Sequence, residues 1–231
     1  MASQPQTRPL LVELLTEELP PKALQRLGQS FAETLRATLE QHHLLAEGCT
    51  VRPLATPRRL AAVFDAVLGQ APEQHYTEKL MPVKIGLTAE REMTPALLKK
   101  LQSKGLEALG VDDLIIESDG KQDTLYARGV AAGETLQAGL QKALEQAITH
   151  LPIPKVMRYQ LADGVSSVRF VRPAHRLIAL WGSDIVPVEA LGLQAGRATE
   201  GHRFMSEGVL EITTADAYEN QLLEEGKVVA G

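Results

Sequence analysis

The sequence is poor in cysteine and aromatic residues and has no long hydrophobic run. Its one cysteine, Cys49, cannot form an intrachain disulfide or a cysteine-based metal cluster. No apolar run approaches the roughly 18 residues that a membrane helix requires. Residues 1–9 are mostly polar and lack the apolar core of a signal peptide. We therefore expect a cytoplasmic, soluble protein without a membrane segment.

Motifs that cradle phosphates or hold catalytic metals are also missing. The chain has no GxxxxGK[ST] loop, no GxGxxG after a strand and no HExxH. A small-molecule enzyme could use the adjacent carboxylates of Glu17 and Glu18, but neighbouring strand residues point to opposite faces. His42 and His43 would diverge on a helix and make a poor metal pair. We expect no catalytic residue, no metal site and no cofactor in this chain.

Aliphatic residues are plentiful, and their spacing predicts the first third to be β-α-β-β. The hydrophobic fraction of the 231 residues is 44%, enough for one large domain or two small ones. The run 10–15, broken by Glu13, reads as a strand. Apolar residues spaced by three and four predict a helix ending near His43. Two further strands, 51–54 and 60–68, follow it.

The middle of the chain has a less regular pattern. Residues 71–84 contain two prolines and little periodicity, so we expect an exposed connection there. Thr94 and Pro95 are typical of a helix start. The apolar residues expected in the core of that helix region are Leu97, Leu98, Leu101, Leu106 and Leu109. Strands at 114–117 and 124–130 are predicted to form a hairpin around Asp119 and Gly120.

A clear helix is predicted at 134–150, where Leu136, Leu140, Leu144 and Ile148 recur every four residues. Short apolar runs at 168–171, 177–181 and 185–191 then read as strands, and a last helix is expected at 216–225. His175 could also begin a short helix.

These elements predict an α+β fold with mixed sheets, packed helices and two sub-domains joined near residues 152–154. The first sub-domain is expected at 8–150. The second, at 151–231, is expected to be strand-rich, basic and truncated at its C-terminus, because nothing before Gly231 marks a natural end.

Basic residues concentrate in the second sub-domain. The whole chain has a net charge of −5, but residues 155–203 hold seven Lys or Arg and four Asp or Glu. Six of those seven cations are arginine, which suits bidentate phosphate contacts. The segment is a possible phosphate footprint. Ordinary surface ion pairing explains the same composition.

Arginine and histidine next to aromatic residues favour RNA binding, with charge for phosphate and a ring for a base. The RNA-binding candidates are Arg58, Arg59, Lys155, Arg158, Arg172, His175, Arg197, His202 and Arg203. A proline turn is expected to expose the first two. A solvated turn or a buried arginine network remains the alternative, and Arg172, within an apolar strand, is the first candidate for burial.

Five segments, in order, resemble the beta subunit of bacterial glycyl-tRNA synthetase. Residues 11–20 resemble "ExGTEELP" and 55–61 resemble "TPRRLA". Residues 151–159 resemble "LPIPKxMRW", 170–177 resemble "FVRPxHWLVAL" and 196–204 resemble "GRxTxGHRF". Each match alone is weak, but together they are specific for the family.

The sequence departs from the family pattern at a few positions. The family usually has Gly where Leu15 stands and Trp where Tyr159 and Arg176 stand. Its "KGP" appears as residues 79–82, and the helix that follows is not typical. The role of residues 71–110 is therefore left open.

The resemblance implies an α+β arrangement similar to the body and tail of archaeal CCA-adding enzymes. It also implies that an alpha subunit activates glycine with ATP and magnesium, whereas the longer beta subunit handles tRNA(Gly). On this basis the chain is expected to be an N-terminal region of glycine–tRNA ligase that supports tRNA binding and is inactive alone. The alternative is a scaffold that docks the alpha subunit without touching RNA.

Overall fold

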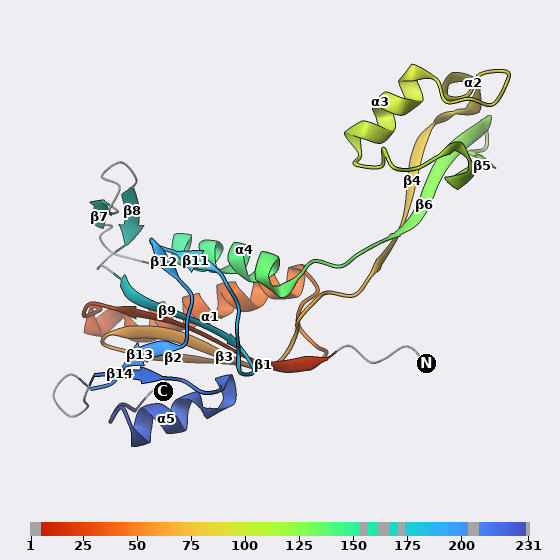
Figure 1. Ribbon diagram of the computed structural model, residues 1–231. Helices are drawn as coiled ribbons and strands as arrows, with labels where there is room; N and C mark the ends of the chain where they lie inside the picture. Colours follow the sequence, from red (N-terminus) through yellow and green to blue (C-terminus); the bar gives the residue numbers. More distant parts are fainter. Residues whose placement is uncertain (1–5, 153–156, 161–166, 171–173, 203–207, 230–231) are drawn as a thin grey trace. The chain divides into compact units, whose positions relative to one another are not determined.

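The computed structural model describes residues 6–152, 157–160, 167–170, 174–202 and 208–229 (Figure 1). It confirms the α+β class, with helices packed on antiparallel sheets. The chain forms two compact units: residues up to Pro72 with those from Glu134 onward, and Glu73–Gly133. Within the described residues, no helix combines the length and hydrophobicity needed to cross a membrane.

The first unit contains a sheet with strand order β10-β9-β1-β3-β2. Its strands are β1 (Thr7–Thr16), β2 (Val51–Thr56), β3 (Arg59–Leu68), β9 (Ala174–Trp181) and β10 (Asp184–Ile185). All neighbouring strands are antiparallel. With α1 (Leu24–Gln41), which follows the short 3-10 helix η1 (Pro21–Ala23), they confirm the predicted β-α-β-β start.

The central strand β1 is buried on both faces, so its residues alternate between two cores. Leu10, Val12 and Leu14 pack into the larger core, whereas Leu11 packs into a second one on the opposite face. Glu13 follows Leu11 by two residues and therefore faces the second core. It is fully buried, which makes it an exception among the aliphatic residues of this strand.

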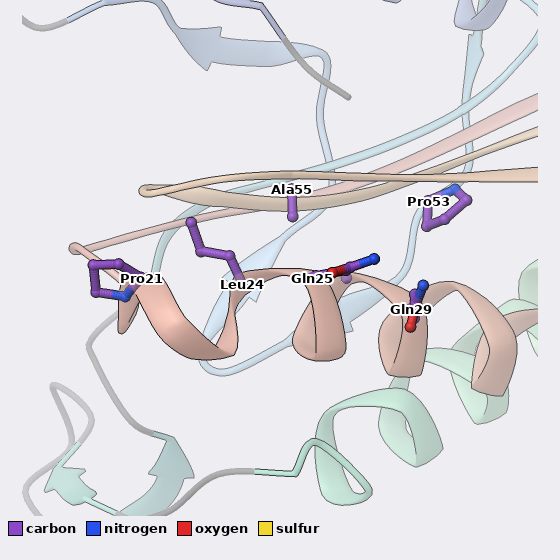
Figure 2. Close-up of a pocket in the computed structure, with 7 residues that line it drawn as sticks. Pro21, Leu24, Gln25, Gln29, Pro53 and Ala55 are labelled. Atoms are coloured by element: carbon purple, nitrogen blue, oxygen red, sulfur yellow. The ribbon is translucent and has the colours of Figure 1, made fainter.

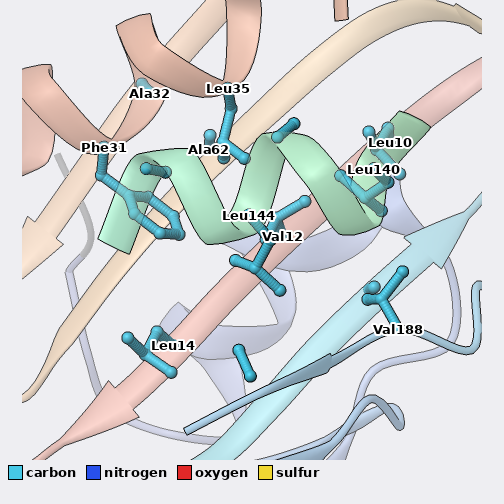
Figure 3. Packing of buried hydrophobic residues seen from close by; sticks show 14 of the residues in the cluster. Leu10, Val12, Leu14, Phe31, Ala32, Leu35, Ala62, Leu140, Leu144 and Val188 are labelled. Carbon is cyan, nitrogen blue, oxygen red and sulfur yellow. The ribbon is translucent and has the colours of Figure 1, made fainter. Parts of the chain in front are cut away.

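Two helices, α1 and α4 (Leu136–Thr149), cover the larger core (Figures 1 and 3). Thr135 caps α4 by accepting a hydrogen bond from the backbone N–H of Ala138 at 3.2 Å. Leu140 and Leu144 point at β1 in Figure 3, and both are fully buried. Burying each such side chain contributes about 1.5–3 kcal/mol. The four-residue stripe is confirmed for its leucines, while Ile148 is partly buried.

The second core is covered by the C-terminal segment (Figure 1). Here the 3-10 helix η3 (Ala215–Ala217) leads into α5 (Tyr218–Glu224), which confirms the predicted last helix. Small antiparallel pairs complete the unit: β7 (Met157–Gln160) with β8 (Ser167–Phe170), β11 (Glu189–Ala190) with β12 (Leu193–Gln194), and β13 (Ala198–Glu200) with β14 (Val209–Glu211). The single strand expected at 185–191 is instead divided between β10 and β11.

The second unit is a three-stranded sheet, β4 (Gln74–Pro82), β6 (Asp123–Ala131) and β5 (Leu114–Ser118), in that order. The helices α2 (Val83–Gly86) and α3 (Pro95–Ser103) and the 3-10 helix η2 (Val111–Asp113) belong to it. Thr94 caps α3, accepting from the backbone N–H of Leu97 at 3.3 Å, and the β5–β6 hairpin is confirmed.

Two expectations for this region are wrong. The segment expected as an exposed connection contains β4, whose pairing with β6 supplies order that its own sequence lacks. Pro82 is the last residue of β4, a position where a missing backbone N–H is tolerated. Leu98, expected in the core, is 53% exposed, because it lies one position from Leu97 and hence about 100° around the helix.

The compact units differ from the division expected at 150/151. Strand β9 returns to pair with β1, so residues on both sides of that position contribute to one sheet. His175 lies in β9, which favours the strand over the short helix considered above. The similarity to CCA-adding enzymes stays a prediction.

Candidate functional site

Three of the segments that carry the family resemblance meet at one end of the central sheet. The register pairs Leu15 of β1 with Arg59 of β3. Thr16 of β1 pairs in turn with Ala174 of β9. The β2–β3 turn and the start of β9 therefore lie beside the end of β1.

A buried cluster of polar side chains lies here, centred on Glu13. Arg59 is 2% exposed, and its Nη1 lies 3.2 Å from Oε2 of Glu13. Thr199 donates to Oε1 of Glu13 at 2.5 Å, and the Tyr218 hydroxyl donates to Oε2. A buried charge is tolerated when it is paired and hydrogen-bonded, and Glu13 has three such partners.

Arg59 also bonds to the ends of two strands, β2 and β13. Its Nε donates to Oγ1 of Thr56 at 3.2 Å, and its Nη2 donates to the carbonyl oxygen of Glu200 at 2.5 Å. The expectation that the proline turn exposes both arginines is thus wrong for Arg59. It is the first residue of β3, and the strand turns its side chain toward the second core.

Tyr218 is held in its neutral form. Burial raises the pKa of its hydroxyl well above the ordinary value, and the neighbouring Glu13 carboxylate raises it further. The phenol therefore remains a hydrogen-bond donor at physiological pH.

A pocket of about 240 Å³ lies beside this cluster. It is lined by Glu18, Thr56, Pro57, Arg58, Arg59, Gly201, His202 and Val228. Three of the RNA-binding candidates border it: Arg58 from the β2–β3 turn, the buried Arg59 from the start of β3, and His202 from a different segment. Within the described residues, no carboxylate lies at ion-pair distance from Arg58, which is half-buried. The Arg58 guanidinium and the His202 imidazole offer a phosphate group charge-assisted contacts in this partly open pocket, beside the carboxylate of Glu18.

Two further candidates, His175 and Arg197, lie away from this pocket and are bonded to other parts of the protein. His175 Nε2 lies 2.6 Å from Oε1 of Glu17. Arg197 donates to backbone carbonyls, with Nη2 at 2.7 Å from the Ser183 oxygen, so it acts as a tie between loops. For Arg158 the structure describes the backbone alone. Lys155, Arg172 and Arg203 lie outside the described residues.

A larger hollow of about 510 Å³ is lined by residues of η1, the start of α1 and β2 (Figure 2). It is lined by Pro21, Leu24, Gln25, Gly28, Gln29, Pro53 and Ala55. None of these side chains is charged, so the hollow does not fit a phosphate. Across the described part of the chain, no three His, Cys, Asp or Glu side chains are placed to hold a metal.

Glu13, Thr199 and Tyr218 were not among the residues that sequence reasoning singled out. A signal for Glu13 existed, since a lone carboxylate in an aliphatic strand needs a buried partner. No comparable signal marked Tyr218, which reaches Glu13 across 205 positions of sequence.

Comparison with known proteins identifies the family to which the sequence is similar. Residues 10–231 match the family described as "Glycyl-tRNA synthetase beta subunit". The chain is 53% identical over 223 residues to a glycine–tRNA ligase beta subunit from Leptothrix cholodnii, covering 96% of the chain and 31% of the relative. For the subunit from Janthinobacterium sp. strain Marseille the identity is 48% over 226 residues, covering 97% and 32%. The chain thus spans about a third of the length of these relatives.

Proposed function

Because the chain belongs to the family of glycyl-tRNA synthetase beta subunits, we propose that it supports tRNA binding during the attachment of glycine to tRNA(Gly). The observation that carries this proposal is the pocket that brings Arg58 and His202 together. Arginine and histidine from two segments can meet one phosphate, and such contacts position an RNA without reading its sequence.

The amino-acid-activating step is proposed to belong to the alpha subunit, the expected partner, with ATP and magnesium bound there. This chain shows no phosphate-loop motif in its sequence. The carboxylate that lines the pocket is Glu18. Of its neighbours, Glu13 is buried and hydrogen-bonded and Glu17 pairs with His175.

The test is tRNA(Gly) binding by the assembled enzyme, with full-length alpha and beta subunits, followed by fluorescence anisotropy. Arg58→Ala is expected to weaken binding about tenfold, the size of one lost charge-assisted hydrogen bond. Arg128→Ala is the matched control, because it removes the same charge from an exposed ion pair with Glu117 in the other unit. It is expected to leave the affinity within about twofold.

Glycine-dependent ATP–pyrophosphate exchange separates tRNA binding from activation. It should be the same in wild type and Arg58→Ala, since the exchange needs no tRNA contact. If Arg58→Ala leaves the tRNA affinity unchanged but loosens the alpha subunit in sedimentation, this end of the sheet docks the partner subunit, and the RNA proposal is wrong.

A further inference from the structure

We propose that Glu13, Arg59 and Tyr218 are positioning residues that hold the walls of the Arg58–His202 pocket in one arrangement. The inference rests on the proposed function and deepens it: the three side chains touch no RNA, but they set where the phosphate-binding groups stand.

The first wall is the β2–β3 turn that carries Arg58. Arg59 Nε donates to Thr56 Oγ1 at 3.2 Å, across the turn. The backbone of the turn is bonded as well, because the N–H of Thr16 donates to the Arg58 carbonyl at 2.7 Å. Arg59, anchored on Glu13, and the backbone of Thr16 thus both hold the turn that carries Arg58.

The second wall is the segment that carries His202. Arg59 Nη2 donates to the Glu200 carbonyl at 2.5 Å, and Thr199 donates to Glu13 at 2.5 Å. Both bonds attach the residues just before His202 to the same buried cluster.

The third wall comes from the C-terminal segment. Tyr218, at the start of α5, is bonded to Glu13, and the backbone N–H of Val228 donates to the Leu222 carbonyl at 3.0 Å. The backbone N–H of His202 donates to the Gly226 carbonyl at 2.5 Å. Close packing adds to this, since a side chain at Gly226 would meet the Leu222 carbonyl oxygen at 2.9 Å and the Gly201 Cα at 3.2 Å.

One carboxylate therefore connects three segments that are far apart in sequence and border one pocket. Holding cations in place before the ligand arrives reduces the ordering cost of binding. No ion pair within the described residues involves the Arg58 guanidinium, so its position depends on the turn that carries it.

The test is a double-mutant cycle on tRNA(Gly) affinity in the assembled enzyme, combining Tyr218→Phe with Arg58→Ala. Tyr218→Phe removes a single hydroxyl that touches no solvent, and circular dichroism checks that the variant is folded. Tyr126→Phe, the same deletion at a half-buried tyrosine of the other unit, is the control. Arg59→Lys provides a second variant, because lysine keeps the charge but cannot reach all of the partners of Arg59.

The expected result is non-additivity. Tyr218→Phe should weaken binding at least about threefold in the wild type and less than about twofold in Arg58→Ala, because the positioned group is already gone. Equal losses in both backgrounds would mean a merely structural role, and no loss from either Tyr218→Phe or Arg59→Lys would overturn the inference. A full affinity in Arg58→Ala would instead refute the RNA surface itself, and the positioning role with it.

Discussion

Arg58 and Arg59 are neighbours in the chain but have opposite environments. Arg58 sits in a two-residue turn beside a pocket, whereas Arg59 opens β3 and is buried against Glu13. Arg58 lies in the turn outside the strand, whereas Arg59 belongs to the face of β3 that also places Ala61 and Val63 in the second core. The two substitutions should therefore have unlike effects.

Arg59→Ala is expected to lower the free energy of unfolding by about 3–5 kcal/mol, because it leaves the Glu13 carboxylate buried without its cation. Arg36→Ala breaks a surface pair with Glu33 and Glu40, each at 2.5 Å, and should cost no more than about 1 kcal/mol. Urea unfolding monitored by circular dichroism measures both. Equal costs would show that Glu13 and Arg59 are accessible to water.

Asp119 provides a prediction on pH. Its carboxylate accepts hydrogen bonds from the backbone N–H groups of Lys121 and Gln122, and its pKa is lowered from 3.8 to about 2. A carboxyl group whose pKa is lowered by folding stabilises the folded state at pH values above its unfolded pKa. This stabilisation is lost as pH falls through the folded pKa.

The stability advantage of wild type over Asp119→Ala should accordingly be complete above about pH 4 and shrink toward pH 2. A carboxyl-carbon NMR titration of Asp119 with a midpoint near 4 would contradict the hydrogen-bonded turn.

At the scale of elements, the helix α4 was predictable and the strand β4 was not. Leucines at every fourth position fix the buried stripe of α4 from local sequence alone. Strand β4 has prolines near both ends and owes its order to pairing with β6. The paired residues are far apart in sequence, from 47 positions for Lys79↔Tyr126 to 57 positions for Gln74↔Ala131. Pairing over such distances leaves no local periodic signal.

Leu140→Ala in α4 is expected to destabilise the protein by about 2–5 kcal/mol, because the side chain is fully buried between the helix and β1. Leu223→Ala in α5 is the matched control: its side chain is 52% exposed, and the change should stay under about 0.5 kcal/mol. Denaturant midpoints of the two variants provide the comparison, and similar midpoints would place Leu140 outside the core.

The same contrast applies to the candidate site. The turn arginines, His202 and the family resemblance could be predicted from sequence, because each belongs to a short local motif. The sequence does not indicate which arginine is buried or that Tyr218 bonds to Glu13. Both depend on tertiary contacts between segments far apart in the chain. Lys155, Arg172 and Arg203 stay predictions.

At the scale of the molecule, residues 73–133 form a unit inserted between β3 and α4. The chain leaves and re-enters the first unit at adjacent points, since the N–H of Ala71 donates to the Glu134 carbonyl at 2.8 Å and Gln70 pairs with Thr135. Insertions with adjacent ends are tolerated when few contacts cross the boundary.

Replacing residues 73–133 by an Asn-Gly turn should therefore leave the first unit folded, because that turn closes a two-stranded connection. Hydrogen exchange of the β1, β3 and β9 amides in the shortened beta subunit measures this. Protection equal to that of the full chain is expected, and uniform loss of protection would mean that the units fold as one.

The central claim, that this end of the sheet contacts tRNA phosphate, is tested most directly by the salt dependence of tRNA(Gly) binding. Each neutralised phosphate contributes a slope of about −0.7 to −0.9 to log K against log[salt]. The account predicts that Arg58→Ala flattens the slope by about one ion, while Arg128→Ala leaves it unchanged. Identical slopes for wild type and Arg58→Ala would contradict the account.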